Sequence, residues 1–281
     1  MDQFCLVCRG TNIAPHFRGL LRCRDCNYIF ADLKLSDEEL AQLYDQSLFN
    51  EGEFHDYSAD RKYFNQNFRL RFRKLQKFLD PQRHQTLLEI GSAYGFFLEV
   101  VHSQFREVLG IDLTDEGVRY TREELQLPAV QADFLEYDFD VSKFDVVCLW
   151  DTIEHLRRPD LYLEKIAALT EPGALLALTT GDIDSPVARF RGERWRMINP
   201  PVHAHYFSRQ TLTRLLDSYQ FEVIYNRSCG FYRSANNVAY IILSLRHQQP
   251  ALFNRLRQLG LLNWGFYLNV YDIMYVIARR R

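Results

Sequence analysis

Four cysteines near the start of the chain form two pairs whose spacing suits metal binding. Cys5 and Cys8 are separated by two residues, as are Cys23 and Cys26, and fourteen residues lie between the pairs. Two intervening residues let one tight turn aim both thiolates at one ion, and two such turns complete a tetrahedral site. Because cysteine fills all four positions, the sequence predicts a structural zinc ion. A stretch this short also has too little apolar core to order itself without metal.

The segment LLEIGSAYGFF, residues 87–97, is typical of a strand that leads into a nucleotide-binding loop. Gly91 and Gly95 allow the backbone to approach a ligand closely, whereas Ala93 replaces the middle glycine of the usual dinucleotide pattern. Glu89 precedes the glycines. Its carboxylate would repel a pyrophosphate and attract an ammonium or sulfonium cation. The loop therefore favours S-adenosylmethionine over a nicotinamide dinucleotide.

Three further carboxylates close the apolar runs that follow this loop. Asp112, Asp133 and Asp151 each end one of them. Asp112 lies about twenty positions after the glycines, which is the spacing of an acid that binds the two ribose hydroxyls of an adenosine. The carboxylates are thus candidates for one binding site.

Three histidines, His155, His203 and His205, are candidates for a general base, the role histidine fills most often. Asp151, Glu154 and His155 have the spacing i, i+3 and i+4, which would place them on one face of a helix. This set predicts either a base, a divalent-ion cluster, or a turn in which only Asp151 contacts the ligand.

His203 and His205 lie in RWRMINPPVHAHYFS, residues 194–208, a loop long enough to reach over a pocket. On an extended chain alternate residues face the same side, so we expect both imidazoles to point together. The alternative is a hydrogen-bonded turn before a helix capped by Ser208. The nearby arginines could clamp a phosphate or carboxylate or lie in solvent; they are Arg189, Arg191, Arg194 and Arg196.

These residues require an alternation of strands and helices to position them. Apolar runs predict strands at 86–91, 107–112, 128–133, 144–151, 173–180 and 221–228. Helical patterns lie between them at 96–105, 115–126, 159–170 and 208–219. Such alternation indicates βαβ units and a parallel sheet covered on both faces. Its ligands bind beyond the carboxyl ends of the strands, where the candidate residues stand.

The cysteine pairs and the sheet are joined by residues 33–80. A helix is predicted at 36–44, an aromatic cluster follows at 49–64, and a basic amphipathic helix runs from 64 to 79 until Pro81 ends it. The aromatic cluster either packs between the two parts of the chain or forms a lid over the site.

The motifs LLEIGSAYGFFLEVV, VLGIDLT, VQADFLEYDF and FDVVCLWDTIEHLRRPDLYLEKIAALTEPGALLALTT occur in this order between residues 85 and 228. They resemble the successive motifs of class I S-adenosylmethionine-dependent methyltransferases. DTIEHL is similar to the stretch found in ubiquinone-biosynthesis O-methyltransferases. The whole layout resembles methyltransferases with an N-terminal zinc ribbon from bacterial small-molecule, sugar and surface-polysaccharide pathways.

The resemblance implies an α/β fold with a doubly wound, Rossmann-like seven-stranded sheet whose last strand is antiparallel. YDIMYVIARR, residues 271–280, fits that strand. The expected divisions are a zinc ribbon at 1–32, the helical linker or lid at 33–80, and a methyltransferase domain at 81–281 with a helical insertion at about 231–266.

The family pattern also implies roles for individual residues. Asp112 would bind ribose, Leu113 would pack by the adenine, and Asp133 with Phe134 would hold the adenine amine and ring. Trp150 and Asp151 would line the floor under the methionine part. The remaining loop residues expected to bind cofactor are Glu89, Gly91, Ser92 and Gly95.

The expected activity is methyl transfer from S-adenosylmethionine to a small molecule, such as a sugar, a lipid-linked acceptor or a secondary-metabolite precursor. O-methylation assisted by a histidine is favoured, because the cofactor carries the reactivity and a hydroxyl must lose a proton. The alternatives are a protein or RNA methyltransferase that uses the ribbon for recognition, and an inactive scaffold.

Composition limits the partners. The chain has 281 residues and a net charge of −2, which argues against a nucleic-acid-coating protein. It shows no secretory signal and no uncharged apolar run of about 18 residues, so we expect a cytoplasmic protein, either a monomer or a homodimer. The apolar faces at 231–266 suit a membrane surface, although packing on the core or on a second subunit is favoured.

Overall fold

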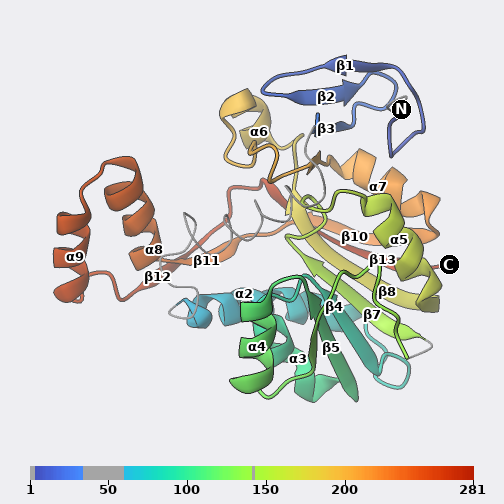
Figure 1. The fold of residues 1–281 in the computed structure, drawn as a ribbon, viewed down its shortest axis with the longest axis horizontal. Coiled ribbons are helices and arrows are strands. Elements are labelled where there is room, and N and C mark those ends of the chain that lie inside the picture. The colour runs from blue at the N-terminus through green and yellow to red at the C-terminus, as the bar shows by residue number, and fades with distance from the viewer. Residues whose placement is uncertain (1–3, 34–59, 141–142) are drawn as a thin grey trace.

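A seven-stranded sheet forms the centre of the protein, whose computed structural model describes residues 4–33, 60–140 and 143–281. The strand order is β10-β13-β8-β7-β4-β5-β6 (Figure 1). The strands are β4 (Thr86–Ile90), β5 (Glu107–Asp112), β6 (Ala129–Gln131), β7 (Phe144–Trp150), β8 (Thr170–Gly181), β10 (Phe221–Ser228) and β13 (Ile273–Arg280). β13 runs antiparallel to both its neighbours and the other pairs are parallel. The predicted fold class, with an antiparallel last strand, is confirmed.

The central strand β7 shows why this sequence builds a sheet with two covered faces. Val147 and Leu149 point into one apolar layer, whereas Val146, Cys148 and Trp150 point into the other. Successive side chains of a strand alternate between faces, so an unbroken apolar run fills both layers at once.

The helices divide between these two layers. α2 (Arg61–Leu75) and α3 (Phe96–Val101) contribute side chains to the layer that contains Trp150. α5 (Pro159–Ala168) and α7 (Arg209–Ser218) contribute to the other layer. α4 (Asp115–Glu123) lies beside β5 and β6.

The predicted amphipathic helix at 64–79 is present as α2 followed by a 3₁₀ turn, η1 (Gln76–Phe78). Its Phe72 and Leu75 are buried under the sheet. The helix predicted at 36–44 and the aromatic residues up to 59 lie outside the described residues.

The cysteine-bearing segment, which we call the ribbon, folds as three short strands, and a fourth strand from the main body pairs with them. β1 (Ile13–Pro15), β2 (Leu20–Cys23) and β3 (Ile29–Ala31) pair in order, and β3 pairs antiparallel with β9 (His205–Tyr206). The outer face of this sheet packs against the segment containing α6 (Pro186–Arg191) and the turn η3 (Gly192–Arg194). The ribbon is therefore tied by strand pairing to the body of the protein.

Residues 231–268 form a projection that we call the arm. Its stem is the antiparallel pair β11 (Phe231–Ser234) and β12 (Gly265–Leu268). Its end contains α8 (Ala235–Ala239), the π-helical turn η4 (Tyr240–Arg246) and α9 (Pro250–Gln258). Figure 1 shows α8 and α9 standing away from the sheet, at the left. No helix in the described ranges is long and apolar enough to cross a membrane.

Candidate functional site

The carboxyl ends of four adjacent parallel strands bring the predicted cofactor residues together. β7, β4, β5 and β6 lie side by side in that order. Gly91 directly follows β4, Asp112 ends β5, Asp133 follows β6, and Asp151 follows β7. The chain leaves β4 toward β5 on one side and reaches β7 on the other, which creates the crevice where such sheets bind ligands.

Glycine is required at both ends of the loop after β4. Gly91 has a φ of +74°, and a Cβ there would come within 2.8 Å of the Thr152 side chain. Gly95, at φ +67°, begins α3. Ala93 also adopts a left-handed φ, of 44°, a conformation in which alanine is strained. Its backbone N–H donates to Asp112 Oδ2 at 2.7 Å, which holds the loop in this conformation.

The Asp112 carboxylate joins the loop to the start of α4. Its Oδ1 accepts hydrogen bonds from the Thr114 N–H at 2.9 Å and from Thr114 Oγ1 at 2.6 Å. A carboxylate offers about four acceptor positions, so Oδ2, which Ala93 occupies once, retains a second. Leu113, the next residue, is 56 % exposed and available to a flat ring.

Glu89 supplies a buried carboxyl group at the end of β4. Its side chain is 2 % exposed and Oε2 has no hydrogen-bond partner. Ser92 Oγ is likewise buried without a partner. Burial, followed by the charge of Asp112, raises the pKa of Glu89 well above its ordinary value. A buried acceptor without a donor is costly, so this position fits the ammonium of a cationic ligand.

Arg71 of α2 is a site residue that the sequence analysis missed. Its Nη2 lies 2.7 Å from Asp151 Oδ2, and its guanidinium lies 5.4 Å from the ring centroids of Trp150 and Phe68. Burial alone would lower the pKa of Arg71, but the Asp151 carboxylate keeps it above its ordinary value. The sequence pattern that could have identified Arg71 is its spacing, three positions after Phe68 and four before Leu75, which places a basic residue on the apolar side of the helix.

Trp150 and Asp151 form the end of β7 as expected. Trp150 is 6 % exposed and packs edge-on against Phe97 and Tyr275. Asp151 has a left-handed φ of 52°, and its N–H donates to the Thr179 carbonyl. This conformation turns the Asp151 side chain toward Arg71.

Phe134 follows β6 with its side chain turned into the core. Its ring is 2 % exposed and packs against Tyr162 and Phe139, with Lys165 above it. A contact of Phe134 with adenine stays a prediction, and the buried ring leaves the backbone of this residue to make it. Asp133 stays at the strand end, where Oδ1 accepts a hydrogen bond from the Leu135 N–H.

His155, in the turn that follows β7, and His203, in the loop before β9, come together. Their ring centroids are 4.7 Å apart with the planes at 80°. His155 Nδ1 lies 3.0 Å from the Val202 carbonyl and His203 Nδ1 lies 2.7 Å from the Met197 carbonyl. A carbonyl only accepts, so Nδ1 carries a proton in each, and in the neutral ring the lone pair is then on Nε2. Burial, followed by the neighbouring His203, lowers the pKa of His155 to about 3.

His205 does not face the same side as His203, so that expectation is wrong. It lies in β9, is 5 % exposed, and its Nδ1 is 2.5 Å from the Tyr28 hydroxyl in the ribbon. Burial lowers the pKa of His205 to about 4. The two histidines diverge because strand pairing with β3 includes His205, whereas the His203 N–H closes a turn onto the Asn199 carbonyl.

Glu154 lies in a turn rather than on the predicted helix face. The His155 N–H donates to the Thr152 carbonyl, and the Glu154 carbonyl accepts from the Ala204 and His205 N–H groups. The Glu154 carboxyl is 2 % exposed, and burial, followed by the charge of Asp151, raises its pKa to about 8. Within the described residues, the four cysteines alone form a group with metal-ligand spacing, so a divalent-ion cluster at Asp151, Glu154 and His155 is not formed.

The arginine run does not gather into a clamp. Arg196 binds the buried Asp272 at 3.0 Å, and Trp195 Nε1 donates to the same carboxylate. Arg189 pairs with Asp184 at the surface. These contacts fix the loop between β8 and β9.

The four cysteines have the geometry of a metal centre. Their Sγ atoms all lie within 4.8 Å of one another, compared with the roughly 3.7 Å edge of a tetrahedron with zinc–sulfur bonds of about 2.3 Å. The two cysteine turns have the same backbone conformation. Arg9 and Asn27 each follow the second cysteine of a pair, with φ values of 63° and 64°. The backbone N–H of each donates to the carbonyl of the first cysteine of its pair. The four thiolates therefore fit zinc, and they fill all four positions of a tetrahedral site, so that none is left for water or substrate.

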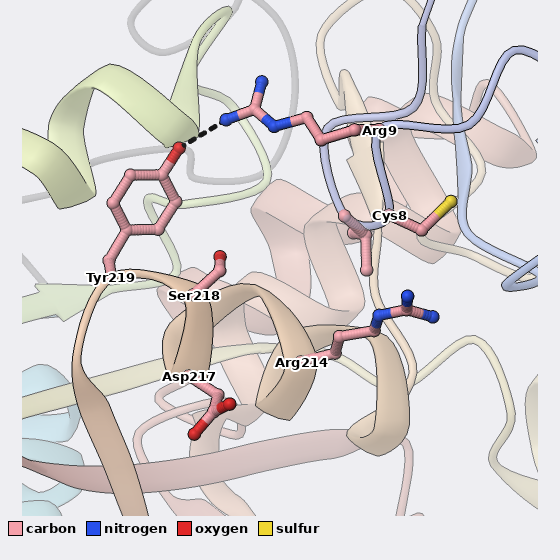
Figure 2. A pocket seen from close by; sticks show the side chains of 7 residues that line it. Cys8, Arg9, Arg214, Asp217, Ser218 and Tyr219 are labelled. Carbon is pink, nitrogen blue, oxygen red and sulfur yellow. Dashed lines mark hydrogen bonds between the residues drawn. The ribbon is translucent and has the colours of Figure 1, made fainter.

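A hollow of about 450 Å³ lies between the first cysteine turn and α7 (Figure 2). The Arg9 guanidinium crosses one side of it and donates to the Tyr219 hydroxyl at 2.9 Å. Its lining residues are Val7, Cys8, Arg9, Arg214, Asp217, Ser218 and Tyr219. None of them belongs to the site at the strand ends, so this hollow is a separate feature of the seam between the ribbon and α7.

Comparison with known proteins places the strand-end site in a family. Residues 59–226 match the family model described as a methyltransferase domain. Two curated relatives are ubiquinone biosynthesis O-methyltransferases. The one from Nitrobacter winogradskyi is 26 % identical over 34 % of this chain and 38 % of its own length. The one from Chelativorans is 24 % identical over 42 % of this chain and 49 % of its own length. The chain thus spans about half or less of the relatives it matches.

Solved structures support the fold. A SAM-dependent methyltransferase from Archaeoglobus fulgidus superposes with a TM-score of 0.53 at 17 % identity, over 80 % of this chain and 100 % of its own. A SAM-dependent methyltransferase from Mesorhizobium loti superposes with a TM-score of 0.50 at 13 % identity, over 74 % of this chain and 97 % of its own. Identity this low speaks to the fold alone.

We expect the isolated protein to contain one zinc ion per chain. Removing it with a chelator should lower the melting temperature, because the four thiolates would lose the ion that holds the ribbon together. Elemental analysis and thermal unfolding measure both effects. Cys23→Ser should bind less zinc, whereas Cys229→Ser, outside the cluster, is the control. Full thermal stability after complete removal of metal would contradict the assignment.

Glu154→Gln should change how stability depends on pH. In the folded protein the pKa of Glu154 is about 8, whereas its ordinary value is 4.5. The protonated carboxyl therefore contributes to the free energy of unfolding in full below pH 4.5, and this contribution is lost as the pH rises to 8. Glutamine carries no such dependence. The melting temperature of the variant relative to the parent should therefore rise from pH 4.5 to pH 8. A constant difference, like that expected for the exposed Glu107→Gln, would refute the buried protonated carboxyl.

Proposed function

Because the chain belongs to the methyltransferase-domain family and is an S-adenosylmethionine-dependent methyltransferase, we propose that it methylates a hydroxyl group of a small molecule. The observation that carries this proposal is the pair of imidazoles His155 and His203, whose ring centroids lie 4.7 Å apart and whose Nδ1 atoms are each bonded to a backbone carbonyl. A hydroxyl nucleophile must lose a proton as it attacks, and a positioned imidazole accepts it.

Different residues at the strand ends would bind different parts of the cofactor. Glu89 would hold the ammonium group, since its buried Oε2 lacks a donor. Asp112 would accept from a ribose hydroxyl at the position left on Oδ2, Leu113 would cover one face of the adenine, and Asp133 would accept from the adenine amine. When bound, the cofactor supplies an electrophilic methyl on a sulfonium, and the protein supplies alignment.

Arg71 and Trp150 would shape the wall beside the methionine part. The guanidinium holds Asp151 in its left-handed conformation through the 2.7 Å contact, and the Trp150 ring, packed on both sides, forms a rigid floor. α2 thus borders the crevice through Arg71.

The two histidines would act on the acceptor. Hydrogen bonds from Nδ1 to carbonyls orient both rings, so that Nε2 is the acceptor atom of each imidazole in its neutral form. The low pKa of His155 keeps it neutral throughout the physiological range but makes it a weak base, so it would orient the hydroxyl as a hydrogen-bond acceptor and leave His203 to take the proton.

Two observations favour a small acceptor. The curated relatives are named for O-methylation in ubiquinone biosynthesis, which supports oxygen as the methylated atom. The ribbon pairs with the body of the protein through β3 and β9, and its other edge strand, β1, is only three residues long. This supports a structural use of the ribbon over recognition of protein or RNA.

Cofactor binding is expected to stabilise the protein, by about 2.7 kcal/mol at one hundred times the dissociation constant. Asp112→Ala should abolish this stabilisation, because the ribose hydroxyls and the Ala93 N–H lose their acceptor. Asp115→Ala, a neighbouring exposed carboxylate in α4, is the control. The measurement is thermal unfolding with S-adenosylmethionine, supported by calorimetry below the melting temperature. Unchanged binding by Asp112→Ala would refute the ribose assignment.

His155→Gln and His203→Gln should leave cofactor affinity intact and lower methyl transfer, with a loss of roughly 10²–10⁴-fold for the base itself. Transfer from labelled S-adenosylmethionine to a panel of hydroxyl compounds, catechol and methyl glucoside among them, measures the effect. His247→Gln, outside the site, is the control. Parent-level transfer by both variants would refute a histidine base, and transfer to an amine such as histamine in place of hydroxyls would refute O-methylation.

A further inference from the structure

The arm, residues 231–268, carries most of the exposed large apolar side chains of the described residues. They are Ile242, Leu245, Leu252, Leu259, Leu261, Trp264, Tyr267 and Leu268. Figure 1 shows that the helical end of the arm stands away from the sheet, so the body does not cover it. A concentration of exposed apolar groups on one projection marks an interaction surface.

The arm is folded in its own right, so this exposure does not come from a failed core. Phe253 of α9 is 1 % exposed, and its ring centroid lies 5.5 Å from that of Tyr240. Ser234 caps α8 by accepting from the Asn237 N–H. Leu252 of α9 and Leu259, the residue that directly follows the helix, are seven residues apart and lie on one face, away from the buried Phe253.

Charge distinguishes the arm from the rest of the chain. Between Glu222 and Asp272 the sequence has no acidic residue, and the charges at the end of the arm are Arg246, Arg255 and Arg257, all exposed. The chain as a whole has a net charge of −2. Exposed leucines beside arginines and a tryptophan suit the boundary between anionic headgroups and acyl chains.

We propose that the arm docks on the surface of a lipid bilayer that contains anionic headgroups. Leu259, Leu261 and Trp264 enter the interface while Arg255 and Arg257 contact headgroup phosphates. Trp264 is 57 % exposed and its Nε1 donates to the Leu261 carbonyl, so its amphipathic ring suits the headgroup level. Contact is peripheral, since no described helix could cross the bilayer. Two-fold pairing would bring together two arms that carry arginines and no acidic residue to pair with them, which disfavours a second copy.

The test uses the full-length protein with vesicles of phosphatidylcholine, with and without phosphatidylglycerol. We expect co-sedimentation with the anionic vesicles alone, weakened by salt. Trp264 reports on the contact because the other two tryptophans, Trp150 and Trp195, are 6 % and 2 % exposed. Its emission should shift to the blue on binding.

Paired variants separate the contributions of charge and apolar contact. Arg255→Gln with Arg257→Gln should weaken binding to anionic vesicles by roughly thirty-fold, and Leu259→Ser should weaken it further. The matched controls lie outside the arm: Phe190→Ser, at a side chain that is 92 % exposed, and Arg119→Gln in α4. Both controls should bind as the parent does.

Two results would overturn the proposal. The first is absence of binding to anionic vesicles, or binding that all the arm variants retain. The second is a dimer in sedimentation velocity that Leu259→Ser dissociates, without vesicle binding, since this would assign the arm to a second copy of the chain.

Discussion

The two-residue strand β9 connects the cysteine-bearing ribbon to the catalytic edge of the sheet. On one side the Ala204 carbonyl accepts from the Ala31 N–H at 2.8 Å. On the other side the Ala204 and His205 N–H groups donate to the Glu154 carbonyl, at 2.8 and 3.1 Å. Backbone hydrogen bonds therefore run without a break from the ribbon to the turn that follows β7.

This connection determines where the two candidate catalytic imidazoles lie. His155 is in the turn that β9 holds, and its Nδ1 is fixed by the Val202 carbonyl two residues before Ala204. The buried contact between Tyr28 and His205 adds a side-chain link from the ribbon to the same strand. Tetrahedral ligation of the cysteines would stiffen the ribbon and, through β9, the histidine pair. A structural metal would then support catalysis without contacting the reactants.

Much of the fold and part of the site could be predicted because they follow local rules. The apolar runs of β4, β5 and β7 end in Gly91, Asp112 and Asp151, and parallel pairing places such ends at one edge. Arg71 could not be placed, because the packing of α2 on the sheet decides which of its basic residues reaches Asp151. The burial of the Phe134 ring could not be predicted, because sequence shows that an aromatic residue follows a strand but not toward which layer it turns. The different environments of His203 and His205 depend on pairing between β3 and β9, which join residues far apart in sequence.

Hydrogen exchange of the backbone amides tests the coupling through β9 most directly. The comparison is between the parent protein and a Cys8→Ser, Cys26→Ser variant that lacks two of the four thiolates. The ribbon, residues 152–156 and residues 203–207 should all lose protection, whereas β4 and β5 should retain theirs. Loss of protection confined to the ribbon, with the Ala204 and His205 amides as protected as before, would contradict the account.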